Sequence, residues 1–278
     1  MKCCKKILTG ATNLHMNLRS ARVAVHMRRA STALVILCAL ALPLSCLAAS
    51  GPVLLELFTS EGCSSCPPAD LLLSHWDHEG SITGVPVICL GYHVHYWNGL
   101  GWKDAWSSAT FTNRQTDYNT ALHNQSNYTP QLVINGREHT VGSKAAEVER
   151  LVKAMARSSV ATISLTHASS AVNGLSEIRI EADAAAGPLP QECELYAATV
   201  LDATQSQVAR GENSGRKLNH AAVVRELVRL ADDIVISNAG MTRNFSLPSP
   251  GSTSRLVLFL QDPVTRHILG ATQIRYPR

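Results

Sequence analysis

Two cysteines separated by two residues, Cys63 and Cys66, are the clearest chemical signal in this sequence. They follow an apolar run over residues 53–58 and precede Pro67 and Pro68, which suit the first turn of a helix. A helix N-terminus favours a thiolate and so lowers a cysteine pKa, and a short disulfide ring opens and closes readily. We therefore predict a redox-active pair. Cys63, ahead of the helix and more exposed, would be the attacking nucleophile, and Cys66 the resolving thiol.

Two histidines offer a second kind of chemistry. His93 and His95 lie two residues apart at the end of a strand pattern, near the rim of the sheet where Cys63 is expected. Imidazole and thiolate ligands suit copper or zinc, so Cys63, Cys66, His93 and His95 form a candidate metal set. The alternative is that both histidines are hydrogen-bonded pocket residues. A zinc knuckle is disfavoured because no second C-x-x-C follows.

Aromatic side chains surround these histidines: Tyr92, Tyr96, Trp97, Trp102 and Trp106. We expect them to form core or pocket wall. If partly exposed, they would provide an apolar surface for a client protein. Tyr92 and Trp97 are the predicted substrate-binding members of this group.

The first half of the chain alternates strand and helix patterns. Its predicted strands cover residues 53–58, 85–90, 131–134 and 137–141. Its predicted helices cover residues 69–76, a stretch from Ser107 or Ser108 to about 122, and 143–157. Asn135 and Gly136 predict a hairpin turn between the last two strands. This order of elements is that of a thioredoxin fold, a central mixed sheet flanked by helices.

Thr129 and Pro130 occupy a second position that matters in such a fold. Thioredoxin-like folds place a cis-proline beside the C-x-x-C, and the residue before it offers backbone groups to a bound peptide. X-Pro bonds are the ones that adopt cis in folded proteins. We predict a cis peptide here, with Pro130 in the catalytic set and Thr129 in the substrate-binding set. The alternative is an ordinary trans proline at a strand edge.

The sequence pattern changes after residue 158. Short apolar or alternating runs separated by Gly, Pro and Asn predict a β-rich, sandwich-like domain. Residues 220–236 fit both a strand and a helical stripe. The RGENSGR stretch over residues 210–216 is expected to be a solvated charged turn. The predicted organisation is a leader at 1–49, a thioredoxin-like domain at 50–158 and a β-rich domain at 159–278.

The basic excess of the chain is confined to its beginning. The net charge is +4, yet residues 1–49 hold seven Lys and Arg and no acidic residue, which leaves 18 basic and 21 acidic residues elsewhere. No basic patch remains for nucleic acid. Arg28 and Arg29 precede an apolar run of about ten residues and a small-residue stretch ending at Ala49, the pattern of a cleaved signal peptide. Translation starting at Met16 or Met27 would fit that pattern better than Met1.

Export would place the protein in the periplasm or outside the cell, with no membrane span after cleavage. Four cysteines would remain: Cys63, Cys66, Cys89 and Cys193. Disulfides form and persist in an oxidising compartment. Cys89 and Cys193 would either pair as a staple between domains or stay buried as free thiols.

The sequence resembles a family of secreted bacterial proteins with a thioredoxin-like fold, catalogued as a domain of unknown function (DUF1223). The matching stretches are ELFTSEGCSSCPPAD at 56–70, YHVHYWNGLGWKD at 92–104, YTPQLVINGR at 128–137 and RGENSGRKL at 210–218. Where the family has an acidic residue after His93 and Val94, this chain has His95, which favours metal binding. The resemblance implies fold and export, and carries redox function over to Cys63, Cys66 and Pro130 only.

The leading hypothesis is an exported thiol–disulfide oxidoreductase that acts on protein thiols or disulfides and exchanges electrons with a further redox partner. The cofactor would be the Cys63–Cys66 disulfide itself. A second hypothesis is a copper- or zinc-binding protein. A third is a non-catalytic interaction module with a structural disulfide. Ser64 and Ser65 carry no charge, and Glu61 should oppose thiolate formation, and both features argue against a very strong oxidant. The direction of electron flow stays open.

Overall fold

The computed structural model describes residues 51–166, 176–182, 190–235, 240–247 and 254–275. The predicted leader at 1–49 lies outside these ranges. The described α-helices have 11 to 13 residues, and none is long and apolar enough to cross a membrane.

The first half of the described chain has the predicted order of elements. These elements are β1 (Val53–Thr59), α2 (Pro67–Glu79), β2 (Ser81–Ile82), β3 (Val85–His93), the 3-10 turn η1 (Asn98–Leu100), α3 (Ala109–Ala121), β4 (Gln131–Ile134), β5 (Glu138–Val141) and α4 (Ala145–Met155). Capping and turn residues determine where several of these elements begin and end. The Ser108 side chain accepts the Thr110 N–H and caps α3. Asn135 and Gly136 both adopt positive φ and make the predicted hairpin turn.

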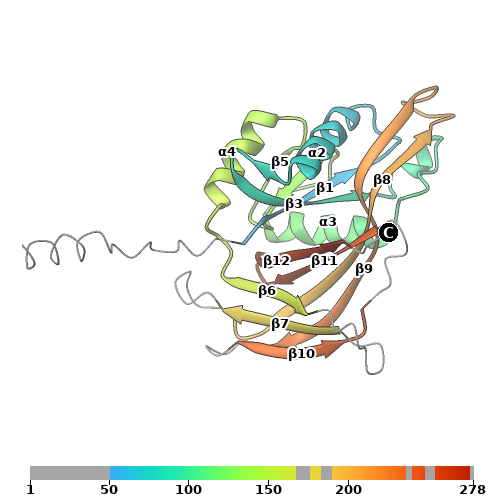
Figure 1. Ribbon diagram of the computed structural model, residues 1–278. Helices are drawn as coiled ribbons and strands as arrows, with labels where there is room; N and C mark the ends of the chain where they lie inside the picture. The colour runs from blue at the N-terminus through green and yellow to red at the C-terminus, as the bar shows by residue number, and fades with distance from the viewer. Residues whose placement is uncertain (1–50, 167–175, 183–189, 236–239, 248–253, 276–278) are drawn as a thin grey trace, which may run out of the picture. The chain divides into compact units, whose positions relative to one another are not determined.

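A large mixed sheet organises the fold. Its strand order is β12-β11-β8-β9-β3-β1-β4-β5, with β2 pairing to β3. Strand β1 runs parallel to β3 and antiparallel to β4. Helices α2 and α4 lie on one side of these strands and α3 on the other (Figure 1). The chain is therefore a mixed α/β protein with a large central mixed sheet.

The second half of the described chain is built of strands, as predicted. They are β6 (Ala161–Thr166), β7 (Ser176–Ala182), β8 (Cys193–Gln207), β9 (Lys217–Ile234), β10 (Met241–Phe245), β11 (Ser254–Gln261) and β12 (Ile268–Arg275). The ambiguous stretch at 220–236 belongs largely to the 18-residue strand β9. Its pairing with β8 contains register shifts, and Ala222 has a positive φ. These irregularities break the strict alternation of a strand, which is why the pattern also fits a helix.

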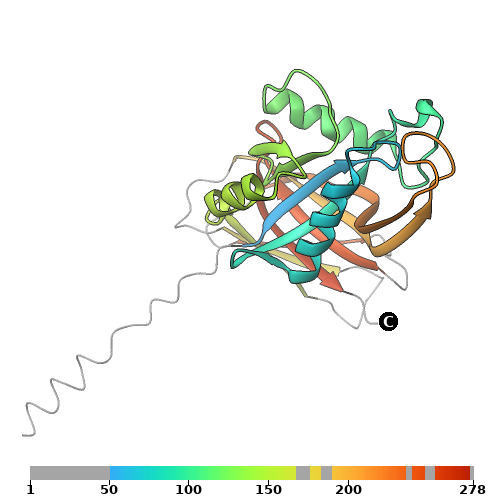
Figure 2. The same cartoon turned by 90° about the horizontal axis from the view of Figure 1, so that it is seen from above.

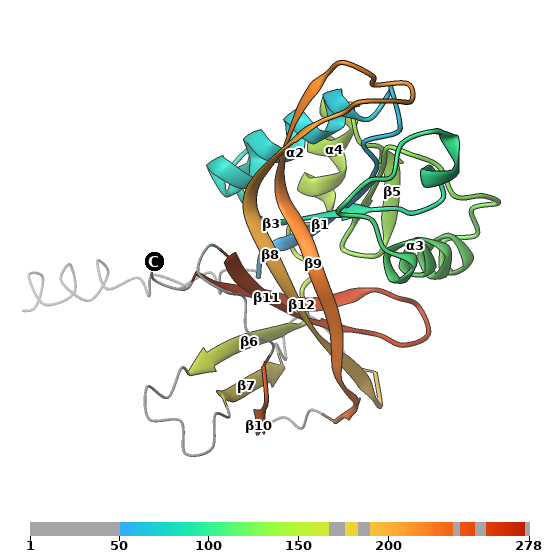
Figure 3. The same ribbon diagram turned by 90° about the vertical axis from the view of Figure 1, so that its right-hand side faces the viewer.

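A second, three-stranded sheet of order β10-β7-β6 packs against the β8, β11 and β12 part of the large sheet (Figure 3). Ile163, Ile178 and Ile180 of the small sheet share a buried cluster with Leu195 and Leu256 of the large one. The two sheets face each other across this cluster, and it forms a core of its own.

The predicted boundary at residue 158 falls between α4 and β6, and strands from both sides of it share the large sheet. Strand β9 runs parallel to β3 and pairs with it at Gly91 and Val223. A Cβ at Gly91 would lie 3.3 Å from the Ala221 carbonyl oxygen, so glycine permits this close approach. Residues 50–278 form one compact unit.

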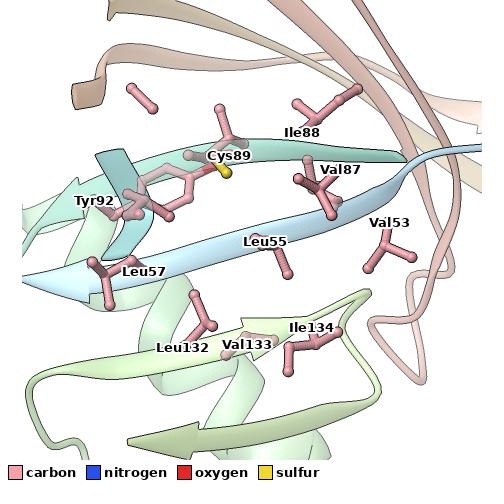
Figure 4. Close-up of a cluster of buried hydrophobic side chains, with 14 of the residues drawn as sticks. Val53, Leu55, Leu57, Val87, Ile88, Cys89, Tyr92, Leu132, Val133 and Ile134 are labelled. Carbon is pink, nitrogen blue, oxygen red and sulfur yellow. The ribbon is translucent and has the colours of Figure 1, made fainter. Parts of the chain in front are cut away.

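Strand β1 is buried along its whole length and forms the centre of the main core (Figure 4). Leu55 and Leu57 lie between Cys89 and Tyr92 of β3 on one side and Leu132 of β4 on the other. This fixed strand ends two residues before Glu61, so it anchors the loop that carries the cysteine pair.

A charged group lies inside this core. Arg114 of α3 donates from Nε to Glu56 Oε1 at 2.7 Å and from Nη2 to the Tyr118 hydroxyl at 2.8 Å. The Tyr118 hydroxyl also donates to Glu56. Glu56 is fully buried, and burial raises the pKa of Tyr118 well above its usual range. Arg114 Nη1 reaches Gln261 Oε1 at 3.2 Å, so the network joins β1, α3 and β11.

Candidate functional site

Cys63 and Cys66 form a disulfide at the start of α2, with their Cα atoms 5.4 Å apart. Cys66 is the residue before the first helical turn, and its carbonyl accepts the Ala69 N–H at 2.9 Å. Pro67 and Pro68 occupy the first helical positions, as predicted. The pair therefore lies at the positive end of the helix dipole.

The expectation that Cys63 is exposed is wrong. Neither Cys63 nor Cys66 has any exposed surface, although Ser64 and Ser65 between them are exposed. The Ser65 hydroxyl lies 3.3 Å from Cys63 Sγ. Position ahead of the helix therefore does not expose Cys63, whose carbonyl also contacts a distant part of the chain.

That distant part is the tip of the β8–β9 hairpin, residues 208–216, which lies beside the start of α2 (Figure 3). Asn213 Nδ2 donates to the carbonyl oxygens of Glu61 and Cys63, both at 2.9 Å. The Glu212 carboxylate accepts the Ser64 N–H at 3.0 Å. Asn213 is fully buried, so the expectation of a simply solvated turn is wrong at this residue.

Trp97 connects the disulfide loop to the proline loop. A Cβ added at Gly62 would lie 3.2 Å from the Cβ of Trp97, so the two residues pack closely. Trp97 Nε1 donates to Thr129 Oγ1 at 2.9 Å. The Thr129–Pro130 peptide bond is cis, which confirms that prediction. Trp97, Thr129 and the cysteine loop therefore belong to one site.

Tyr92, predicted to contact substrate, lies in the core. It is fully buried, stacks on Phe58 with ring centroids 5.4 Å apart and meets Phe111 edge-on at 5.2 Å. Burial raises the pKa of Tyr92 well above its usual range. In this structure the side chain presents no surface to a ligand.

Five buried polar side chains lie close to the disulfide loop, and we call them the acid–histidine cluster: Glu61, Asp70, His93, Asp104 and His220. His93 Nδ1 lies 2.7 Å from Asp104 Oδ2, which also accepts the Glu61 N–H at 2.9 Å. Burial alone would raise the pKa of Asp104, but facing His93 lowers it overall. Burial alone would lower the pKa of His93, but Asp104 raises it overall.

His220 of β9 links the two remaining carboxylates. Its Nε2 lies 3.6 Å from Glu61 Oε1 and its Nδ1 lies 3.7 Å from Asp70 Oδ2. Its ring meets His93 edge-on with centroids 4.8 Å apart. Burial raises the pKa of Asp70. Burial would also raise the pKa of Glu61, but the facing His220 lowers it overall, with a further contribution from Trp102, whose Nε1 donates to Oε2 at 2.6 Å.

An open groove of about 760 Å³ lies between α2 and the β8–β9 hairpin. Its lining includes Asp77 and His78 of α2, Asp202 of β8, and Asn219 and His220 of β9. His220 therefore connects the groove to the acid–histidine cluster.

The structure does not assemble the predicted metal ligands. The two sulfurs are bonded to each other, His93 is engaged with Asp104, and His95 Nδ1 lies 2.7 Å from Thr112 Oγ1. Within the described ranges no group of three or more His, Cys, Asp or Glu side chains could hold a metal ion. Copper or zinc binding is therefore still an expectation from the sequence.

Cys89 and Cys193 are free and buried, so the staple alternative is not observed. Burial raises the pKa of Cys89 well above its usual range and that of Cys193 to about 11. Both thiols therefore stay protonated and unreactive in the folded protein at neutral pH.

Asp104→Asn is expected to destabilise the protein most between about pH 4 and pH 6.5. The lowered pKa of Asp104 stabilises the fold above the unfolded-state value of 3.8, and this contribution is lost as pH falls through the folded value. The raised pKa of His93 stabilises it below 6.5, and this contribution is lost as pH rises through the folded value. Urea unfolding of both proteins at pH 3, 5.5 and 9 measures the difference. A difference that does not change with pH would contradict this coupling.

The fold and the site define a class: a mixed α/β protein with a buried disulfide at the N-terminus of a helix. Within that class, the chain belongs to the family described as Protein of unknown function (DUF1223), which matches residues 54–261. No curated protein matches the sequence.

Two solved structures resemble this chain. One is the crystal structure of protein AGR_C_4864 from Agrobacterium tumefaciens, with 27% identity, 81% of this chain and 94% of that chain covered, and a TM-score of 0.63. The other is HBP35 of Porphyromonas gingivalis, with 15% identity, 81% and 75% covered, and a TM-score of 0.52. The second shows likeness of fold alone.

Proposed function

We propose that this protein is an exported thiol–disulfide oxidoreductase that acts on protein thiols or disulfides through Cys63 and Cys66. The observation that carries the proposal is the Cys63–Cys66 disulfide at the N-terminus of α2. The order strand, helix, strand, helix, two strands and helix over residues 53–155 supports a thioredoxin-like fold for this part of the chain.

The proposed chemistry is thiol–disulfide exchange. A client thiolate attacks Cys63 Sγ, the Cys63–Cys66 bond breaks, and Cys66 leaves as a thiolate. A second client thiol then attacks the mixed disulfide and releases Cys63. Two electrons pass from client to protein, and an exported disulfide partner takes them up. With a disulfide client the same steps run in reverse, and Cys66 resolves the mixed disulfide.

The surroundings of Cys66 suit its role as leaving group. After the bond breaks, its sulfur lies at the N-cap position of α2, where the helix dipole stabilises negative charge. Pro67 and Pro68 have no N–H groups, and the Ala69 N–H donates to the Cys66 carbonyl, so the stabilisation comes from the helix dipole and not from a free backbone donor of that turn. The ionised Glu61 carboxylate, two residues before Cys63, limits this stabilisation.

The position of the hairpin tip also supports the assignment of Cys63 as the attacked sulfur. The hairpin tip contacts Glu61, Cys63 and Ser64, all on the Cys63 side of the disulfide. Movement of the tip would uncover that side first. Trp97 and Thr129 flank the same loop and are the proposed contacts for a client chain.

Catalysed reduction of insulin by dithiothreitol tests the proposal. The wild-type protein is expected to accelerate the reaction, and Cys63→Ser to reduce the rate to that of dithiothreitol alone. Refolding of scrambled ribonuclease provides the same test in the oxidising direction. Equal rates for wild type and Cys63→Ser in both assays would reject the enzyme function.

Complete burial of the disulfide favours one competing function, a non-catalytic interaction module in which the disulfide is structural. Structural disulfides of secreted proteins have reduction potentials below about −300 mV, and catalytic ones lie higher. Equilibration of the protein with glutathione or dithiothreitol buffers distinguishes the two functions.

A further inference from the structure

We infer that the tip of the β8–β9 hairpin, residues 208–216, is a gate over the Cys63–Cys66 disulfide and that Asn213 holds it closed. The inference rests on the proposed function, because it concerns access of thiols to that site. With both cysteines fully buried, no thiol can reach either sulfur in the structure as it stands. Exchange therefore requires a local movement, and the tip is the element that is hydrogen-bonded to the Cys63 side of the loop.

The hydrogen bonds of Asn213 explain why this residue would hold the tip against the disulfide loop. The amide NH₂ has two hydrogens, and both are used, on the carbonyl oxygens of Glu61 and Cys63 at 2.9 Å each. The amide oxygen accepts from Arg216 Nη1 at 2.8 Å, which fixes its orientation. The neighbours Glu212 and Ser214 are exposed, so the buried amide is the inward-pointing group of the turn.

Hydrogen bonds within the tip would let it move as a rigid unit. The Val208 N–H donates to Arg216 C=O at 2.9 Å and the Gly215 N–H donates to Val208 C=O at 2.8 Å, which closes the loop on itself. These bonds do not involve the disulfide loop. The hydrogen bonds that join the tip to that loop come from the Asn213 amide and from Ser64, which donates to Glu212. Gly211 of the tip also packs on Trp102, since a Cβ at Gly211 would lie 3.4 Å from the Trp102 Cβ. Opening breaks these contacts and leaves the turn intact.

Reduction of the purified protein by dithiothreitol tests the gate. A dithiothreitol thiolate attacks Cys63 Sγ, Cys66 leaves as a thiolate, and the second thiol of the reagent closes its own disulfide and frees Cys63. Loss of two hydrogen bonds corresponds to a roughly 30-fold change in the population of the open state. We expect Asn213→Ala to be reduced roughly 30-fold faster than wild type, and Ser214→Ala, whose hydroxyl donates to Ala209 C=O within the tip, to match wild type.

Asn213→Asp provides a second variant of nearly the same shape. It replaces the NH₂ donor by an acceptor facing two carbonyl oxygens, so it should open the gate at least as well. Alkylation followed by mass spectrometry reports which thiols react. Local opening labels Cys63 and Cys66 and leaves the buried thiols of Cys89 and Cys193 unlabelled.

Equal reduction rates for wild type, Asn213→Ala and Asn213→Asp would overturn the gate. So would simultaneous labelling of Cys89 in both variants, which would assign the faster rate to global unfolding. Failure of the proposed function looks different: the reduction rates would follow the prediction, while insulin turnover would stay at background for wild type and Asn213→Ala alike.

Discussion

Cys66→Ser is expected to trap a disulfide client on Cys63 as a stable mixed disulfide. In the variant the Cys63 thiolate attacks the client disulfide, and one client sulfur leaves. No second thiol is then placed to resolve the product. Serine is a favoured residue ahead of a helix, and its hydroxyl can cap α2, so the variant should fold. With oxidised glutathione as the client, intact-mass spectrometry should show most of the protein as the adduct.

Cys63→Ser is the matched control. It keeps Cys66, whose sulfur lies at the helix N-cap, further from the part of the loop that the hairpin tip covers. We expect little adduct with this variant. Equal trapping by both single variants would remove the assignment of Cys63 as the attacked sulfur. Trapping by neither would favour a structural disulfide.

The cysteine pair, the helix start after it and the Asn135–Gly136 turn could be predicted from the sequence, because each depends on a few neighbouring residues. The C-x-x-C, the two prolines and the Asn135–Gly136 turn each act over a few neighbouring residues, and the structure has them as predicted. The exposure of Cys63 could not be predicted. The Cys63 loop contacts Asn213, 150 residues away, and no spacing rule links the two. The co-occurrence of both stretches in one family was the available signal.

The acid–histidine cluster could not be predicted for a related reason. The sequence places His93 beside His95, yet the partner of His93 is Asp104, eleven residues further on, and His220 comes from β9. The pattern of residues 220–236 fits both a strand and a helix, so it does not fix the position of His220 in the sheet. The continuity of the large sheet across residue 158 depends on the single pairing of Gly91 with Val223, which leaves no periodic trace in either strand.

Arg114→Met is expected to destabilise the protein by about 3–5 kcal/mol, the usual cost of leaving a buried charge without its partner. The variant keeps most of the side-chain volume but leaves the fully buried Glu56 carboxylate without its cation. Burial alone would lower the pKa of Arg114, and the facing Glu56 raises it overall. The guanidinium also lies 4.9 Å from the ring centroids of Tyr118 and Phe259. Urea unfolding measures the loss.

Two further variants decide whether this loss comes from the stranded charge. Adding Glu56→Gln to Arg114→Met removes the uncompensated carboxylate, so the double variant should recover most of the lost stability. Arg150→Ala breaks an exposed pair with Glu147 and should leave the stability nearly unchanged, because solvent screens the two charges. If the double variant is as unstable as the sum of the two single changes, the loss comes from packing around Arg114. The ion pair would then add nothing to the anchoring of β1, the strand that leads into the cysteine loop.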